Sequence, residues 1–148
     1  MVVEEITYKT YDDEVITEKF YFNLNEAEIA ELELDMPGGL MNYIDTIRKS
    51  KNKSEIIRIF KKLLMRAYGI KSPDSKRLIK SDEISLAFTQ TEAYNELFKK
   101  LVHNDISIAD FIFGILPSDW TKEAKNNPEV QKIIAELPAA KTEVGGNA

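Results

Sequence analysis

Few residues in this chain are of the types that catalyse reactions or hold metals. His103 is the only histidine and cysteine is absent, which excludes histidine-based metal clusters, thiolate zinc sites and His–Cys pairs. Gly38-Gly39 lacks the further glycines and the Lys-Ser/Thr ending of a phosphate-binding loop. We therefore expect no enzyme, no metal and no cofactor. His103, beside Asn104 and Asp105, fits a polar residue at a helix end better than a lone general base.

The densest group of carboxylates lies in a short stretch of the N-terminal third. Its members are Glu26, Glu28, Glu31, Glu33 and Asp35. A glycoside hydrolase uses two carboxylates on either side of the scissile bond. On an amphipathic surface helix, however, such a run is usually a solvated face, and we expect that here.

Charge is distributed in blocks. Residues 1–46 carry a net charge of −10, residues 48–80 carry +10 and residues 81–148 carry −5. The basic block predicts an alternative function, that of a small nucleic-acid-binding regulator using residues 48–80 against phosphates. No aromatic stacking platform accompanies these bases, and the acidic block is equal and opposite. We therefore expect the two blocks to face each other and nucleic acid not to be a partner.

The chain length of 148 residues fits one domain, and 43% hydrophobic residues suffice for a core. The first residues do not resemble a signal peptide, and no apolar run approaches the roughly 18–20 residues of a membrane span. The absence of cysteine is typical of a reducing compartment. These features predict a cytoplasmic protein without membrane contact.

Periodicity predicts an α+β fold that is mostly helical. Residues 3–11 and 14–22 alternate as two strands of an antiparallel β-hairpin joined by Asp12-Asp13. We expect this hairpin to pack on a bundle of about five or six short α-helices, because a lone hairpin is marginal in water. The predicted helices cover residues 26–34, 40–47, 55–68, 84–88, 91–102 and 107–115, and residues 77–80 are a short strand.

Local signals fix several boundaries of these elements. Asn25 and Glu28 form a capping-box pattern, and Ser54 is the expected N-cap of the central helix, which Gly69 ends. Apolar density falls after Pro117. We therefore expect one globular domain over residues 1–117 and a C-terminal appendage over residues 118–148, partly disordered as a flexible tail.

Apolar side chains near the end of the predicted domain exceed what one helix face buries. Ile108, Phe111, Ile112 and Ile115 form one stripe, whereas Phe113 and Leu116 point elsewhere and Trp120 follows Pro117. One of these sets is a candidate docking face for another protein, and burial of both in the core is the alternative. The predicted partner-binding residues are Phe111, Phe113, Leu116 and Trp120.

The order of several short segments resembles a known protein family. Phe20-Tyr21-Phe22-Asn23-Leu24 enters an acidic helix, Gly38-Gly39-Leu40 precedes the next, and Tyr68-Gly69 is followed by Ser72-Pro73-Asp74 and by Arg77 to Ser81. Phe88-Thr89-Gln90-Thr91-Glu92-Ala93-Tyr94 and Phe113-Gly114-Ile115-Leu116-Pro117 come next. Over about residues 6–117, this order resembles the tail assembly chaperones of long, flexible-tailed (siphovirus-type) phages and related prophages.

The resemblance implies a non-catalytic function in viral tail morphogenesis. Such a chaperone binds the long, apolar, helical tape measure protein, keeps it soluble and leaves as tail tube subunits polymerise. It would act in the cytoplasm of the bacterial host and be absent from the mature virion. A longer form made by translational frameshifting would contact the tail tube protein, and this chain resembles the short form. Self-association stays open at this stage.

Overall fold

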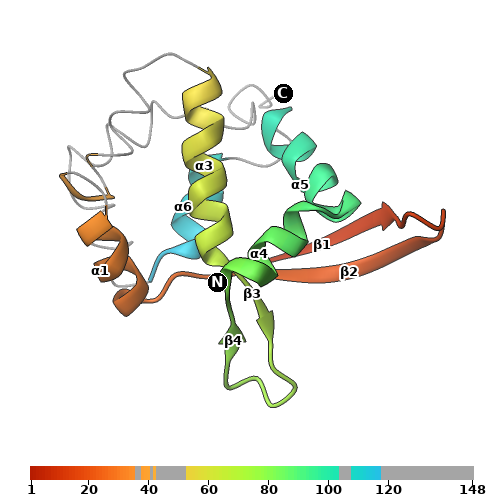
Figure 1. Cartoon of the computed structure of the whole chain (residues 1–148), viewed down its shortest axis with the longest axis horizontal. Helices are drawn as coiled ribbons and strands as arrows, with labels where there is room; N and C mark the ends of the chain where they lie inside the picture. Colours follow the sequence, from red (N-terminus) through yellow and green to blue (C-terminus); the bar gives the residue numbers. More distant parts are fainter. Residues whose placement is uncertain (36–37, 41, 43–52, 104–107, 118–148) are drawn as a thin grey trace, which may run out of the picture.

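The computed structural model describes residues 1–35, 38–40, 42, 53–103 and 108–117. It has an N-terminal β-hairpin, a second short hairpin and a group of helices around one core (Figure 1). The predicted α+β class is confirmed. Helices account for only about half of the described residues, so the expectation of a mostly helical protein was too strong. The helix predicted over residues 40–47, the start of the helix predicted at Ser107 and the segment 118–148 lie wholly or largely outside the described residues.

The N-terminal hairpin consists of β1 (Val2–Lys9) and β2 (Val15–Phe22), as the alternation predicts. The strands pair antiparallel, with Ile6 opposite Glu18 and Glu4 opposite Phe20. Ile6, Phe20 and Phe22 are buried on the face toward the helices, whereas every second residue of β1, from Val3 to Lys9, is exposed on the other face. This is the period of two that a half-buried sheet requires.

Two further strands extend the hairpin into a four-stranded sheet of order β1-β2-β3-β4. β3 (Tyr68–Lys71) pairs antiparallel with β2, and β4 (Leu78–Ile79) pairs with β3. The strand predicted over 77–80 is therefore confirmed. The expected helix end at Gly69 is wrong, because Tyr68 and Gly69 belong to β3. A Cβ on Gly69 would lie 2.5 Å from Leu78 Cγ, so glycine permits the close approach of β4 instead of ending the helix.

The helix α3 (Lys53–Ala67) runs through the middle of the molecule (Figure 1). Phe60, Leu63 and Leu64 are buried along it, whereas Ile57 is 38% exposed. The prediction of a central helix is confirmed. The cap predicted at Ser54 is not observed, because the helix already begins at Lys53.

The other described helices pack around α3 and the sheet. They are α1 (Glu26–Asp35), α4 (Asp82–Thr89), α5 (Glu92–Val102) and α6 (Ile108–Ile115). Ser81 and Thr91 cap α4 and α5, each accepting a hydrogen bond from a backbone N–H three residues later. α5 and α6 both contact β1. Among the described helices, none is long and apolar enough to cross a membrane.

A cluster of aromatic rings joins the sheet to the helices. Phe22 lies 5.8 Å from Phe88 of α4 and 5.3 Å from Phe111 of α6, measured between ring centroids. Tyr68 stacks on Phe88 at 4.2 Å. Because this cluster includes residues from β2, β3, α4 and α6, the hairpins and the helices share one core.

Candidate functional site

The described side chains that could take part in acid–base or metal chemistry do not lie together in one site. No group of three or more potential metal ligands occurs among the described residues. His103 is exposed and is the C-cap residue of α5, as its helix-end position predicts. Burial raises the pKa of the Glu4 carboxyl, and the positive charge of Lys100 opposes this shift. One perturbed carboxyl is not an acid–base pair.

The carboxylates of α1 form an exposed face with local structural contacts. Glu31, Glu33 and Asp35 are exposed, and Glu33 Oε1 accepts a hydrogen bond from the backbone N–H of Leu40. Glu28 completes the predicted capping box: its N–H donates to Asn25 Oδ1 at 2.8 Å, and its Oε1 accepts from Asn25 N at 3.0 Å. Glu28 and Glu33 therefore make structural contacts with the segments that precede and follow α1.

Two ion pairs join the acidic and basic blocks of the sequence in the folded chain. Lys80 Nζ lies 2.7 Å from Glu28 Oε2, and Arg66 Nη1 lies 3.8 Å from Asp35 Oδ2. Lys80 Nζ also donates a hydrogen bond to the backbone oxygen of Asn23 at 2.5 Å. Part of the basic block therefore stabilises the start of α1.

The four predicted partner-binding residues have different environments. Phe111 and Leu116 are only 3% and 5% exposed, and the ring centroids of Phe111 and Phe60 are 5.7 Å apart. Phe113 is half-buried and packs against the core cluster. Trp120 lies outside the described residues. The structure thus places Phe111 in the core and leaves Leu116 at the edge of an open cleft.

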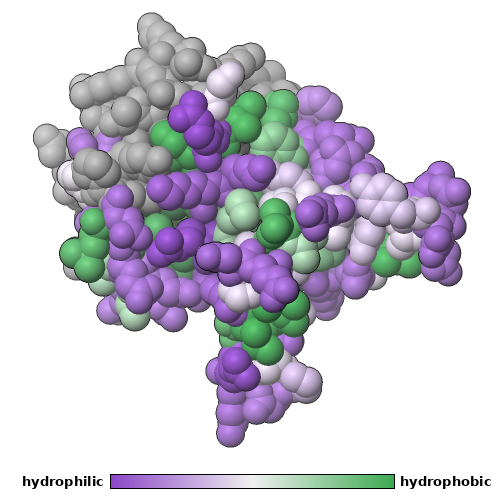
Figure 2. Space-filling view, viewed as in Figure 1, coloured by the Kyte–Doolittle hydropathy of each residue, from purple (hydrophilic) through white to green (hydrophobic). Residues whose placement is uncertain are grey.

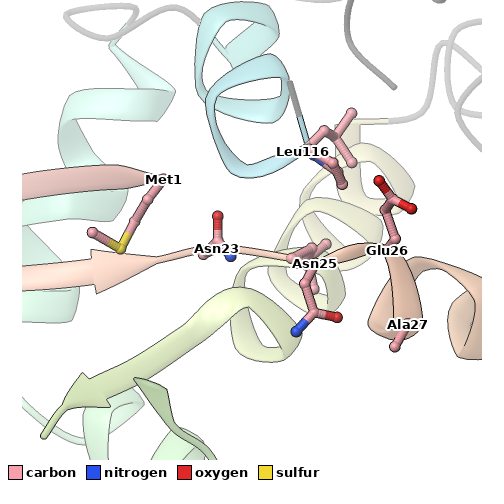
Figure 3. A pocket seen from close by; sticks show the side chains of 8 residues that line it. Met1, Asn23, Asn25, Glu26, Ala27 and Leu116 are labelled. Carbon is pink, nitrogen blue, oxygen red and sulfur yellow. The ribbon is translucent and has the colours of Figure 1, made fainter. Parts of the chain in front are cut away.

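This cleft has a volume of about 540 Å³ and lies between the N-terminus, the β2–α1 junction and the end of α6 (Figure 3). Its apolar lining comes from two distant parts of the sequence. Met1, Leu24 and Ala27 belong to the N-terminal part, and Leu116 and Pro117 follow α6. Asn23, Asn25 and Glu26 add polar groups. The recess is therefore open, and its lining is polar and apolar in comparable shares.

Hydrogen bonds hold the walls of the cleft in place. Leu24 N donates to Ile115 O at 2.7 Å, which joins the β2–α1 junction to the end of α6. Asn23 N donates to Ala67 O at 2.9 Å, while Lys80 binds Asn23 O from the other side. These hydrogen bonds fix the backbone that borders the recess.

Sequence reasoning identified one wall of this cleft and missed the other. Leu116 was a predicted partner-binding residue, whereas Met1, Leu24 and Ala27 were not. No local signal connects them, because residue 24 follows β2 and residue 116 follows α6, and only the tertiary structure brings these two segments together. The Lys80–Glu28 contact was missed for the same reason.

Comparison with known proteins adds one finding. A family model described as "Phage tail assembly chaperone" matches residues 1–144. The matched segment includes every residue that the structure describes. No curated protein and no solved structure matches the chain.

Proposed function

Because the chain belongs to the phage tail assembly chaperone family, we propose that it binds the tape measure protein and keeps it soluble while the tail tube assembles. The observation that carries this proposal is the family match over residues 1–144. The protein acts by binding and not by catalysis. It works in the cytoplasm of the bacterial host and leaves before the virion is complete.

We further propose that the cleft beside Leu116 receives apolar side chains of this client. An amphipathic helix presents anchors at positions i, i+3, i+4 and i+7, and a recess of about 540 Å³ has room for such anchors. Full burial of one leucine-sized anchor contributes about 1.5–3 kcal/mol. The half-buried Phe113 and the predicted residue Trp120 extend the proposed contact along and beyond α6.

Contacts of this size make each single copy a weak binder. Several copies on one long client would gain affinity through multivalency, without any new kind of contact. Weak individual contacts also allow tail tube subunits to displace the copies one at a time. A longer frameshifted form is the proposed link to the tail tube protein.

The test is co-expression with a tape measure fragment that is insoluble alone. Ala27→Glu places a charge in the cleft at an exposed position, and an acidic residue in the first turn of a helix does not destabilise it. We expect the client to become insoluble, because a carboxylate is costly in a desolvated apolar contact.

The matched control is Ala30→Glu, the same change on the same helix at an exposed residue that does not line the cleft. Circular dichroism would establish that both variants are folded. Retained solubilisation by folded Ala27→Glu would remove the cleft from the proposal. Client binding by the native protein would also be measured at low and high salt. If high salt removes most of the bound client, the contact is mainly electrostatic, since apolar contacts are not weakened by salt.

A further inference from the structure

The sequence after Pro117 contains one apolar repeat with the spacing of a helix face. Most large apolar side chains of residues 118–148 stand at positions i, i+3, i+4 and i+7, which are Val130, Ile133, Ile134 and Leu137. These residues lie outside those that the structure describes. The family model extends over them, because it matches residues 1–144. The repeat therefore lies within the family region of the chain.

Local signals predict a short helix around this repeat. Asn127 is a favoured N-cap residue, and Pro128 suits the first helical position, where no backbone N–H is needed. Pro138 directly follows Leu137, and a proline at this place ends a helix. A helix over residues 128–137 is about 15 Å long and carries the four apolar side chains on one face. Its other positions include Glu129, Gln131, Lys132 and Glu136.

The last described residues border the cleft. Leu116 and Pro117 both line it, and Leu24 N donates to Ile115 O at 2.7 Å, which fixes the end of α6 beside another lining residue. Twelve residues, 118–129, separate Pro117 from Val130. As a flexible coil, a linker of this length spans about 17–21 Å. A helix at the end of such a linker can therefore return to the cleft.

The lining of the cleft suits an amphipathic segment. Met1 is 59% exposed, and Ala27 is also exposed (Figure 3). An apolar helix face that covers these groups removes them from water, which is favourable. Because the lining also contains Asn23, Asn25 and Glu26, a helix with polar positions beside its apolar face fits it better than a wholly apolar one.

A competing apolar surface lies at the base of the β3–β4 hairpin, where Figure 2 shows hydrophobic side chains. Ile70 is 47% exposed there, and Leu78 and Ile79 are half-buried. None of these three residues lines the cleft, whereas Pro117, from which the linker starts, does. The tether therefore favours the cleft over the hairpin.

We propose that residues 128–137 dock as an amphipathic helix in the cleft of their own molecule and that the client displaces them. A short tether supplies an effective concentration on the order of 1 mM, so a contact with a Kd of about 0.1–1 mM occupies the cleft half of the time or more. Docking then weakens client binding about two- to tenfold, because only the uncovered fraction binds. The displacement rests on the proposed function of the cleft, whereas the docking does not.

The first experiment tests the docking by disulfide formation, since the chain has no cysteine. Ala27→Cys joins the cleft to Ile134→Cys in one chain, and a disulfide needs the two Cα atoms within about 7 Å. Under mild oxidation this pair should react on the order of tenfold faster than two control pairs, because docking holds the thiols together. One control is Ala27→Cys with Lys132→Cys, on the opposite helix face, and the other is Ile70→Cys with Ile134→Cys. Equal rates in all three pairs, or the fastest reaction at Ile70, would overturn the proposal.

Intact mass spectrometry separates an internal disulfide from one that joins two chains. The internal product should dominate at every protein concentration, because the tether makes the reaction intramolecular. Disulfide-linked dimers as the main product in dilute protein would refute docking within one molecule.

Two double variants of the segment differ only in the helix face that they change. Ile133→Asp with Leu137→Asp, the released variant, should leave the cleft, because a carboxylate is costly in a desolvated apolar contact. Gln131→Asp with Ala135→Asp, the matched variant, gives the same change of net charge off the apolar face and should stay docked. Both place two aspartates in the same predicted helix, so their effects on helix propensity are comparable.

NMR spectra of the full chain read out the cleft itself. The backbone amide signals of Leu24 and Ala27 should move in the released variant and stay in place in the matched variant. A synthetic peptide of residues 127–138, added to the released variant, should return them toward their native positions with a Kd of about 0.1–1 mM. Equal movement in both variants, or none in the released variant, would contradict the docking.

Client binding separates the docking from the displacement. The released variant should bind a tape measure peptide about two- to tenfold more tightly than the native chain, and the matched variant should not. If the internal disulfide forms but Ala27→Glu still keeps the client soluble, the proposed function of the cleft fails and the docking stands. If Ala27→Glu loses the client while the released variant binds it no more tightly, the displacement is wrong.

Discussion

Replacing Lys80 by Met should destabilise the protein far more than removing a typical surface lysine. Lys80 Nζ donates to Asn23 O at 2.5 Å and to Glu28 Oε2 at 2.7 Å, and the side chains of Lys80 and Glu28 are only 17% and 27% exposed. Methionine keeps most of the aliphatic length but removes the charge and the donors. The variant leaves a partly buried carboxylate and a carbonyl without their partner.

The expected magnitude lies between the limits for exposed and buried pairs. A hydrogen bond to a charged group contributes about 1.5–3 kcal/mol, and exposed ion pairs contribute about 0.2–1 kcal/mol. For two such bonds that remain partly solvated, we expect a loss of about 2 kcal/mol in the free energy of unfolding. At about 2–4 °C per kcal/mol for a chain of this size, Tm should fall by about 4–8 °C.

The assay is urea unfolding followed by circular dichroism, with a double-mutant cycle on Lys80→Met and Glu28→Gln. The amide oxygen that Glu28→Gln introduces can still accept from Asn25 N, so the cycle isolates the Lys80 contact with a coupling of about 1–2 kcal/mol. The control pair is Lys99–Glu96, separated by 3.3 Å with side chains 54% and 36% exposed. Lys99→Met should cost no more than about 0.5 kcal/mol. Equal losses for Lys80→Met and Lys99→Met would refute this reasoning.

Two further outcomes test the core and the pH response. Phe60→Ala and Leu64→Ala should each cost about 2–5 kcal/mol in urea unfolding, because these side chains are only 5% and 1% exposed; unfolding like the wild type would show that α3 is not central. Burial, followed by the hydrogen bond to Glu18 and its charge, raises the pKa of Tyr8 from 10.0 to about 12. Since the folded state keeps this proton longer, its contribution to stability is complete below pH 10 and is lost as pH rises toward about 12. Burial also raises the pKa of Tyr68 and Tyr94, and the hydrogen bond to Glu92 raises that of Tyr11, so several phenols should titrate late. In an ultraviolet difference titration, Tyr8→Phe should lose the phenol that titrates latest, and an unchanged late phase in this variant would contradict the assignment.

Local sequence patterns predicted most of the helices and strands. Alternation in residues 3–11 and 14–22 predicted the hairpin, because one face must be apolar and the other solvated. Asn25 and Thr91 marked the starts of α1 and α5, because the first N–H groups of a helix need acceptors that these side chains supply. The surplus of apolar residues near Phe111 also pointed to the part of the chain that borders the cleft.

Contacts between distant segments decided the rest. The sequence by itself determined the α+β class, the division of charge into blocks and the absence of histidine–cysteine chemistry, since these depend on composition and on neighbours within one turn or strand. Only the tertiary structure placed Tyr68 and Gly69 in a strand, because pairing with Tyr21 and Phe22 of β2 outweighed the helical periodicity before them. It also brought Leu116 beside Leu24 in the cleft. Such proximity arises from the packing of whole elements around one core, where each position depends on residues far along the chain.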